Sequence, residues 1–246
     1  MKEGFSSRRF MAAFSFLTIF SPPSIEEKDA AGSLTYFPLV GLLLGCLLWA
    51  CAHALGEAFY PAITAVFIVS ILSIVTRGAL LDGLAAAFDG FGSGGNAEEM
   101  VETMRREQRG TFGIIGLVLA LLAKYLLISE LIEGGHVLSL LFFPTVGRWS
   151  MISLAWFFPA LEKEAIMEYP ASRGFWWATG ITFLCAVFIH GLVGVGIMVL
   201  VWVGTYGLGQ YCVKKMGGIT THVMGAVAEL TEIFSLAVLA AVYGSL

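Results

Sequence analysis

Charged side chains are scarce in this chain. Only 13% of its 246 residues are Asp, Glu, Lys or Arg, while 58% are hydrophobic, and the mean hydropathy is +0.84. A soluble domain of this length does not need so much apolar sequence to fill one core. The scarcity of charge therefore excludes an ordinary soluble protein and predicts an integral membrane protein.

Two other patterns are also missing. The four cysteines show no CxxC spacing and lie in or beside apolar runs, so we expect small buried side chains in place of a metal site or a disulfide. The apolar runs do not alternate with a period of two, which argues against membrane strands, and an open strand would leave its amides unpaired in lipid. We therefore predict an all-α membrane protein with a single domain over residues 1–246. The cysteines are Cys46, Cys51, Cys185 and Cys212.

Seven apolar stretches are long enough, or nearly so, for a helix of about 20 residues that crosses the hydrocarbon. One long run supplies two of them, and we break it at His190 and Gly191, its most polar point. Residues 10–20 are too short to cross and precede Pro22 and Pro23, which stop a helix. We expect a short interfacial or re-entrant helix there; a signal peptide is the alternative, although no small-residue cleavage site follows. The predicted spans are 34–55, 61–80, 113–132, 137–158, 174–190, 192–210 and 223–244.

Basic residues are missing from alternate loops. No Lys or Arg lies in the loops near Glu57, Glu133 or His190, whereas the N-terminal segment and the other three loops are basic. The positive-inside rule then places the N-terminus in the cytoplasm and, with seven spans, the C-terminus outside. We expect a bacterial cytoplasmic (inner) membrane protein whose basic loops share the cytoplasmic face. Their residues are Lys2, Arg8, Arg9, Lys28, Arg105, Arg106, Arg109, Lys163, Arg173, Lys214 and Lys215.

The polar residues most suited to chemistry lie in one of these loops, predicted over residues 81–112. Asp82 and Asp89 are seven residues apart, so on a continuous helix they would be two turns apart and project to the same side. Carboxylates at a membrane surface suit Mg²⁺, which commonly bridges protein carboxylates and substrate phosphates. This spacing makes the two aspartates candidate metal ligands.

The same loop carries three arginines after a polar helix that begins near Glu98. Arg105, Arg106 and Arg109 could hold phosphate, because the guanidinium group binds phosphate oxygens bidentately. The alternative is a solvated basic loop that anchors the topology and contacts anionic lipid headgroups. Spacing alone does not decide between these two interpretations.

Charged residues also lie inside the predicted spans, among them Lys124, Arg148, Glu229 and Glu232. A charge in hydrocarbon is costly unless it is paired, wet or able to snorkel, so such residues usually face the interior of a bundle. Glu229 and Glu232 are three residues apart and share a helical face; a site role and a structural role are equally open for them. We expect a site or pairing role for Arg148. Lys124 is expected to snorkel or to pair with Glu130.

Six strings occur in order along nearly the whole chain. They are FPLVG at 37–41, LDGLAAAFDG at 81–90, RGTFG at 109–113, LLAKYLLISEL at 121–131, LGQ at 208–210 and GGITTHVMGAVAELTE at 217–232. Together they resemble the cobalamin synthase family, the membrane adenosylcobinamide-GDP ribazoletransferases. The resemblance is specific at the level of the family.

This resemblance implies an enzyme of cobalamin biosynthesis. In the family, α-ribazole or its 5′-phosphate attacks the β-phosphate of adenosylcobinamide-GDP, GMP leaves, and Mg²⁺ is required. By analogy Asp82 and Asp89 would be catalytic residues and metal ligands, and Glu229 and Glu232 would complete the metal site from the last helix. The other residues implied are Arg105, Arg106, Arg109, Arg148 and Thr220 for substrate binding and His222 for catalysis.

Three carboxylates that the family usually carries are replaced here, by Ala86, Arg106 and His222. One hypothesis is a remodelled enzyme in which Arg106 supplies the positive charge of a metal. The other is a non-catalytic paralogue that binds a corrinoid or a membrane partner. A transporter is disfavoured, because the chain shows no internal repeat or broken pair of spans of the transport kind. The expected partners are the two substrates and membrane lipid, without nucleic acid, and self-association into a homo-oligomer is left open.

Overall fold

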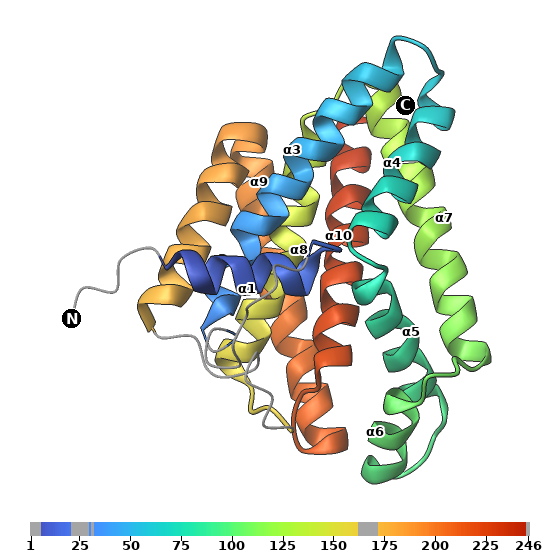
Figure 1. The fold of residues 1–246 in the computed structure, drawn as a ribbon, viewed down its shortest axis with the longest axis vertical. Helices are drawn as coiled ribbons and strands as arrows, with labels where there is room; N and C mark the ends of the chain where they lie inside the picture. Colours follow the sequence, from blue (N-terminus) through green and yellow to red (C-terminus); the bar gives the residue numbers. More distant parts are fainter. Residues whose placement is uncertain (1–5, 21–29, 31, 162–171, 245–246) are drawn as a thin grey trace.

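A computed structural model describes residues 6–20, 30, 32–161 and 172–244. Within these residues the regular structure is helical, apart from an isolated bridge between Ala160 and Ile219. This confirms the all-α prediction. The elements are α1 Ser7–Leu17, η1 Ser33–Tyr36, α3 Phe37–Gly56, α4 Pro61–Val75, α5 Ala79–Gly92, α6 Ala97–Arg105, α7 Thr111–Glu133, α8 Ser139–Phe157, α9 Ser172–Met216 and α10 Thr221–Tyr243 (Figure 1).

Five of the described helices, α3, α7, α8, α9 and α10, are long and apolar enough to cross a membrane. The longest, α9, consists of two limbs, because Gly191 has non-helical backbone angles (φ 56°, ψ −130°). A Cβ added to Gly194 would lie 2.5 Å from the carbonyl oxygen of Ala186, so the limbs fold back on each other. The predicted break at His190 and Gly191 is therefore confirmed.

The second predicted span, residues 61–80, is wrong at its end. The helix α4 ends at Val75 and α5 begins at Ala79 after a bend of 86°. Arg77 and Gly78 cause this bend, since both adopt left-handed backbone conformations (φ 54° and 62°) that end a helix. Much of the segment predicted as a loop is consequently helical, as α5 and the short polar helix α6.

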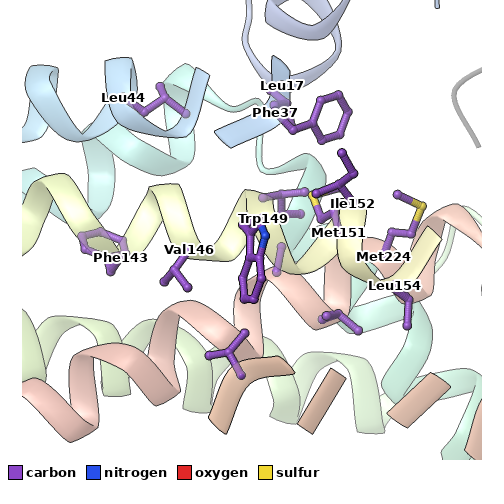
Figure 2. Packing of buried hydrophobic residues seen from close by; sticks show 14 of the residues in the cluster. Leu17, Phe37, Leu44, Phe143, Val146, Trp149, Met151, Ile152, Leu154 and Met224 are labelled. Carbon is purple, nitrogen blue, oxygen red and sulfur yellow. The ribbon is translucent and has the colours of Figure 1, made fainter. Parts of the chain in front are cut away.

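The most buried helix is α8, which packs against α3, α9 and α10 and forms the centre of the bundle. Figure 2 shows its side chains, among them Phe143, Val146 and Trp149, between the surrounding helices. Glycine lets α3 approach closely, because a Cβ at Gly45 would lie 2.6 Å from the Cα of Leu141. Small residues are the usual means of such close packing between membrane helices.

The predicted N-terminal helix is present as α1. It runs across the bundle at a large angle to the long helices (Figure 1). It buries Ala12, Ala13 and Leu17 and exposes Met11 and Phe16. A helix that lies across the spans with apolar residues on its outer side suits the surface of a membrane.

Candidate functional site

The motif strings at 81–90, 109–113 and 208–210 and the first part of the string at 217–232 meet at one end of the bundle, the lower end in Figure 1. There α5, α6 and the start of α7 lie beside the end of α9 and the start of α10. The rings of Phe91 in α5 and Tyr211 in α9 have centroids 5.4 Å apart. The Thr220 hydroxyl lies 3.8 Å from the Met104 sulfur, which brings the start of α10 against α6. The tertiary structure thus joins segments that are more than one hundred residues apart.

Asp82 and Arg109 form a bidentate ion pair in this region. The Arg109 Nε and Nη2 atoms donate to the two carboxylate oxygens of Asp82 at 2.8 and 2.7 Å. Its Nη1 donates to the carbonyl oxygens of Met104 and Arg106 at 3.2 and 2.6 Å. Arg109 therefore fastens the linker between α6 and α7 to α5, a use that differs from the substrate-binding role implied by the resemblance. The Asp82 side chain stays 55% exposed beside the pair.

Asp89 fastens the same linker at a second point. Its two carboxylate oxygens accept hydrogen bonds from the backbone N–H groups of Gly110 and Gly113, at 2.6 and 2.7 Å. These amides belong to the start of α7, where N–H groups lack helical partners and the helix dipole favours a negative charge. A Cβ at Gly113 would lie 2.4 Å from Asp89 Oδ2, so only glycine allows this contact. Asp89 thus caps α7 from another helix.

The start of α10 lies directly against α5. A Cβ at Gly83 would meet the His222 carbonyl oxygen at 2.9 Å and the Gly225 Cα at 3.0 Å, so the two backbones touch. His222 therefore packs against Gly83, which follows Asp82 in α5. Thr220 is the N-cap of α10, and its buried hydroxyl accepts a hydrogen bond from the Val223 N–H at 3.2 Å. The substrate-binding role predicted for Thr220 would have to coexist with this cap.

Arg105 and Arg106 lie at the exposed edge of the site. Arg105 is the last residue of α6, and Arg106 begins the linker that Arg109 and Asp89 hold. The Arg106 side chain is 62% exposed and pairs with Glu102 only at 3.9 Å. Exposed ion pairs of this kind contribute little energy, so the Arg106 guanidinium can turn to an incoming anion.

Four of the charged residues inside the spans, Lys124, Arg148, Glu229 and Glu232, form a buried network. The Lys124 ammonium group lies 2.6 Å from a Glu229 carboxylate oxygen and 2.5 Å from one of Glu232. Arg148 donates to the other oxygen of Glu232. All four side chains are 5% exposed or less, and they come from α7, α8 and α10. We call this group the buried charge network.

The network corrects the prediction that Lys124 reaches the membrane surface or pairs with Glu130. Lys124 does not snorkel, because its side chain is only 2% exposed and its ion pairs with Glu229 and Glu232 lie inside the bundle. Arg148, Glu229 and Glu232 are ion-paired in the structure, and a site role for them stays a prediction. The physical reason is the low dielectric of the interior, where opposite charges stabilise each other strongly and water cannot.

The carboxylates do not gather into a metal site. Among the described residues, no group of three or more His, Cys, Asp or Glu side chains is arranged to hold a metal ion. Asp89 caps a helix, Asp82 pairs with arginine, and Glu229 and Glu232 pair with buried cations. The four carboxylates predicted as metal ligands therefore do not lie together as one group in this structure, and their role as metal ligands stays a prediction. The donors present do not fit a Mg²⁺ ion held by several protein carboxylates.

The structural role of Arg77 at the helix break was not predicted from the sequence. Arg77 lies inside the run assigned to the second span, yet it is a charged residue next to a glycine, which is a helix-stop signal. The backbone amides of Gly110 and Gly113 were not predicted either, because nearly every residue has a backbone N–H group and the residue type does not show which one is used. The glycines of RGTFG were the available hint, since glycine permits another group to approach the backbone closely.

The fold and this site define a polytopic α-helical membrane protein with a basic, carboxylate-bearing surface at one end of its bundle. The chain belongs to the family described as cobalamin-5-phosphate synthase, whose model matches residues 9–240. This match confirms the resemblance seen in the motifs. No solved structure matches the chain.

Curated relatives agree with the family. An adenosylcobinamide-GDP ribazoletransferase of Syntrophobacter fumaroxidans is 32% identical, over 95% of this chain and 98% of the relative. Proteins of the same name from Geotalea daltonii and Escherichia coli are 33% and 32% identical, over 96% and 95% of this chain and 98% and 100% of the relatives. The similarity thus covers nearly the full length on both sides.

Proposed function

We propose that this protein transfers α-ribazole or its 5′-phosphate onto adenosylcobinamide-GDP and releases GMP, the last step of nucleotide-loop assembly in cobalamin biosynthesis. The observation that carries the proposal is the full-length family match, which includes α5, the linker to α7 and the start of α10. The basic surface at this end of the bundle suits a diphosphate substrate.

Each side chain of the site has a role in this proposal. Displacement at phosphorus places negative charge on the leaving and bridging oxygens, and positioned cations stabilise it. Arg105 and Arg106 supply that charge at the exposed edge. The imidazole of His222, a residue of α10 whose backbone packs on α5 at Gly83, accepts the proton of the attacking hydroxyl. Asp82 and Asp89 act by holding the arginine-bearing linker in place.

We also propose the orientation of the protein in the cytoplasmic membrane. The basic residues of the α6–α7 linker and of the end of α9 lie at the end of the bundle that carries the site. The stacked rings of His136, His190 and Tyr243 mark the opposite end, where the connecting residues include no Lys or Arg. The positive-inside rule favours a cytoplasmic site and N-terminus, where nucleotide substrates are available. The exposed apolar faces of α7 and α9 would contact lipid.

The direct test is an assay with the purified protein in lipid nanodiscs. Adenosylcobinamide-GDP and α-ribazole should yield GMP and a cobalamin product, both measured by chromatography. Arg106→Ala should lower kcat/KM by about 10- to 100-fold, because a hydrogen bond to a charged group contributes about 1.5–3 kcal/mol. Arg173→Ala is the matched control, since it removes an exposed arginine at the start of α9, which lies on the side of the bundle away from α5.

The result of this assay separates the two hypotheses about the altered motifs. Product formation that depends on Arg106 supports a working, remodelled enzyme. Absence of GMP, together with binding of the corrinoid measured by absorbance, would instead identify a non-catalytic paralogue.

The role of a divalent metal has a test of its own. Since the four carboxylates predicted as metal ligands are bonded to cations or backbone amides, we expect at least about half of the transfer rate to survive a chelator such as EDTA, with arginine in place of a metal. Initial rates of GMP release with EDTA, and with Mg²⁺ added back, measure this. Complete loss in EDTA that Mg²⁺ restores would refute the arginine hypothesis and assign a metal to the substrate diphosphate.

A further inference from the structure

The break between α4 and α5 is attached to the N-terminal helix. The Arg77 Nη2 atom donates to the carbonyl oxygen of Ser15 in α1 at 3.1 Å. The Ile19 N–H, just after α1, donates to the carbonyl oxygen of Val75, the last residue of α4, at 2.8 Å. These two hydrogen bonds connect segments that are far apart in the sequence. They tie the end of α1 to the point where the chain turns into the motif helix α5.

Arg77 itself is held in an unusual backbone conformation. Among the described residues it is the only non-glycine residue with a positive φ, at 54°. A left-handed backbone is unfavourable for a residue with a Cβ, so it persists where the surroundings hold it. Gly78, with φ 62°, follows as the N-cap of α5. The conformation of these two residues sets the direction in which α5 leaves the bend.

The helix α1 offers a stable point of attachment. The Ser6 N–H donates to the Tyr36 hydroxyl at 2.8 Å, and the ring of Phe16 stacks on that of Phe37 with centroids 5.7 Å apart. The helix is therefore packed on η1 and the start of α3. A movement of α1 relative to the bundle would be transmitted through Arg77 to α5.

The bend at Arg77 and Gly78 lies within one helical turn of the site residue Asp82. The Asp82 N–H donates to the Gly78 carbonyl oxygen at 2.7 Å, so Asp82 lies in the first turn after the bend. Its carboxylate holds Arg109 and, through it, the linker that carries Arg106. We propose that Arg77 is a positioning residue for the transfer reaction, which fixes α5 and the attached linker to α1. This inference rests on the proposed function for its kinetic part only.

Variants at this position test the link in the full-length protein in nanodiscs. Arg77→Ala should lower kcat by about tenfold. This is less than the loss on the order of 100-fold that a shift of about 1 Å in a reacting group can cause, because Arg77 acts through α5 and does not touch the substrate. Arg77→Lys keeps a long cationic donor and should stay within about threefold of the unmodified protein. Arg77→Gly relieves the backbone strain but removes the side chain, so it should be as slow as Arg77→Ala.

Hydrogen exchange gives a readout that does not need activity. In Arg77→Ala and Arg77→Gly, the amides of the first turn of α5 should exchange about tenfold faster, while those of the second half of α10 stay unchanged. Ser73→Ala is the matched control, because it removes a side-chain hydrogen bond within α4, to the Val69 carbonyl oxygen, without touching α1. If Arg77→Ala does not fold, Arg77→Gln, which is neutral and shorter, replaces it in the comparison with Arg77→Lys.

Two results would overturn the proposal. One is normal exchange in α5 in both Arg77→Ala and Arg77→Gly. The other is full activity in Arg77→Gly, which would show that only the backbone conformation matters. If the unmodified protein releases no GMP, the proposed function fails, and the exchange experiment still decides whether Arg77 holds α5.

Discussion

Asp89→Asn is expected to destabilise the start of α7 and to abolish most of the transfer activity. The asparagine side chain has one acceptor oxygen for two N–H groups, those of Gly110 and Gly113, and its NH₂ group would face one of these donors. We expect the free energy of unfolding to fall by about 2–4 kcal/mol, from a lost charged hydrogen bond and a lost charge at a helix N-terminus. Thermal unfolding in detergent and the GMP assay measure the two effects.

The control for this prediction lies on the same helix. Asp82→Asn makes the same chemical change at a side chain that is 55% exposed, where about 1 kcal/mol or less is expected. Gly113→Ala disturbs the same contact at the amide partner, since its Cβ would lie 2.4 Å from Asp89 Oδ2. It should lower the free energy of unfolding as much as Asp89→Asn. Equal stability of the Asp82→Asn and Asp89→Asn proteins would contradict the capping role.

Glu232→Ala is expected to destabilise the protein even more than Asp89→Asn. The buried charge network holds two cations and two anions, and this change leaves Lys124 and Arg148 with only Glu229. Breaking a buried ion pair from one side costs about 3–5 kcal/mol, because a charge is left buried without its partner. The unfolding midpoint in SDS and the yield of folded protein measure the loss.

A double variant tests whether uncompensated charge is the cause. Glu232→Leu with Arg148→Met leaves the Lys124–Glu229 pair and restores neutrality, so it should recover much of the stability, since apolar replacements of buried pairs are often tolerated. Glu57→Ala, at an exposed position after α3, should stay within about 0.5 kcal/mol of the unmodified protein. A double variant as unstable as Glu232→Ala would show that packing, and not charge, is what Glu232 supplies.

The spacing of Asp82 and Asp89 predicted their place in the fold but not their partners. The interval of seven residues placed Asp82 and Asp89 on one helix, and α5 confirms this geometry. The same interval could not reveal that an arginine 27 residues away and two backbone amides occupy their oxygens. Carboxylates suited to a metal are equally suited to a guanidinium group or a helix end. The choice depends on which partner the fold brings within hydrogen-bonding distance.

The class of fold, the break at Gly191, the polar helix α6 and the family could all be predicted from the amino-acid sequence. Each of these rests on local properties: continuous hydropathy, helix-stopping residues and ordered motifs. The bend at Arg77, the partners of Asp82 and Asp89 and the ion pairs of the buried charge network became visible only in the folded protein. These depend on contacts between residues far apart in the chain, and in a low-dielectric interior the nearest available opposite charge or donor determines what a polar side chain does.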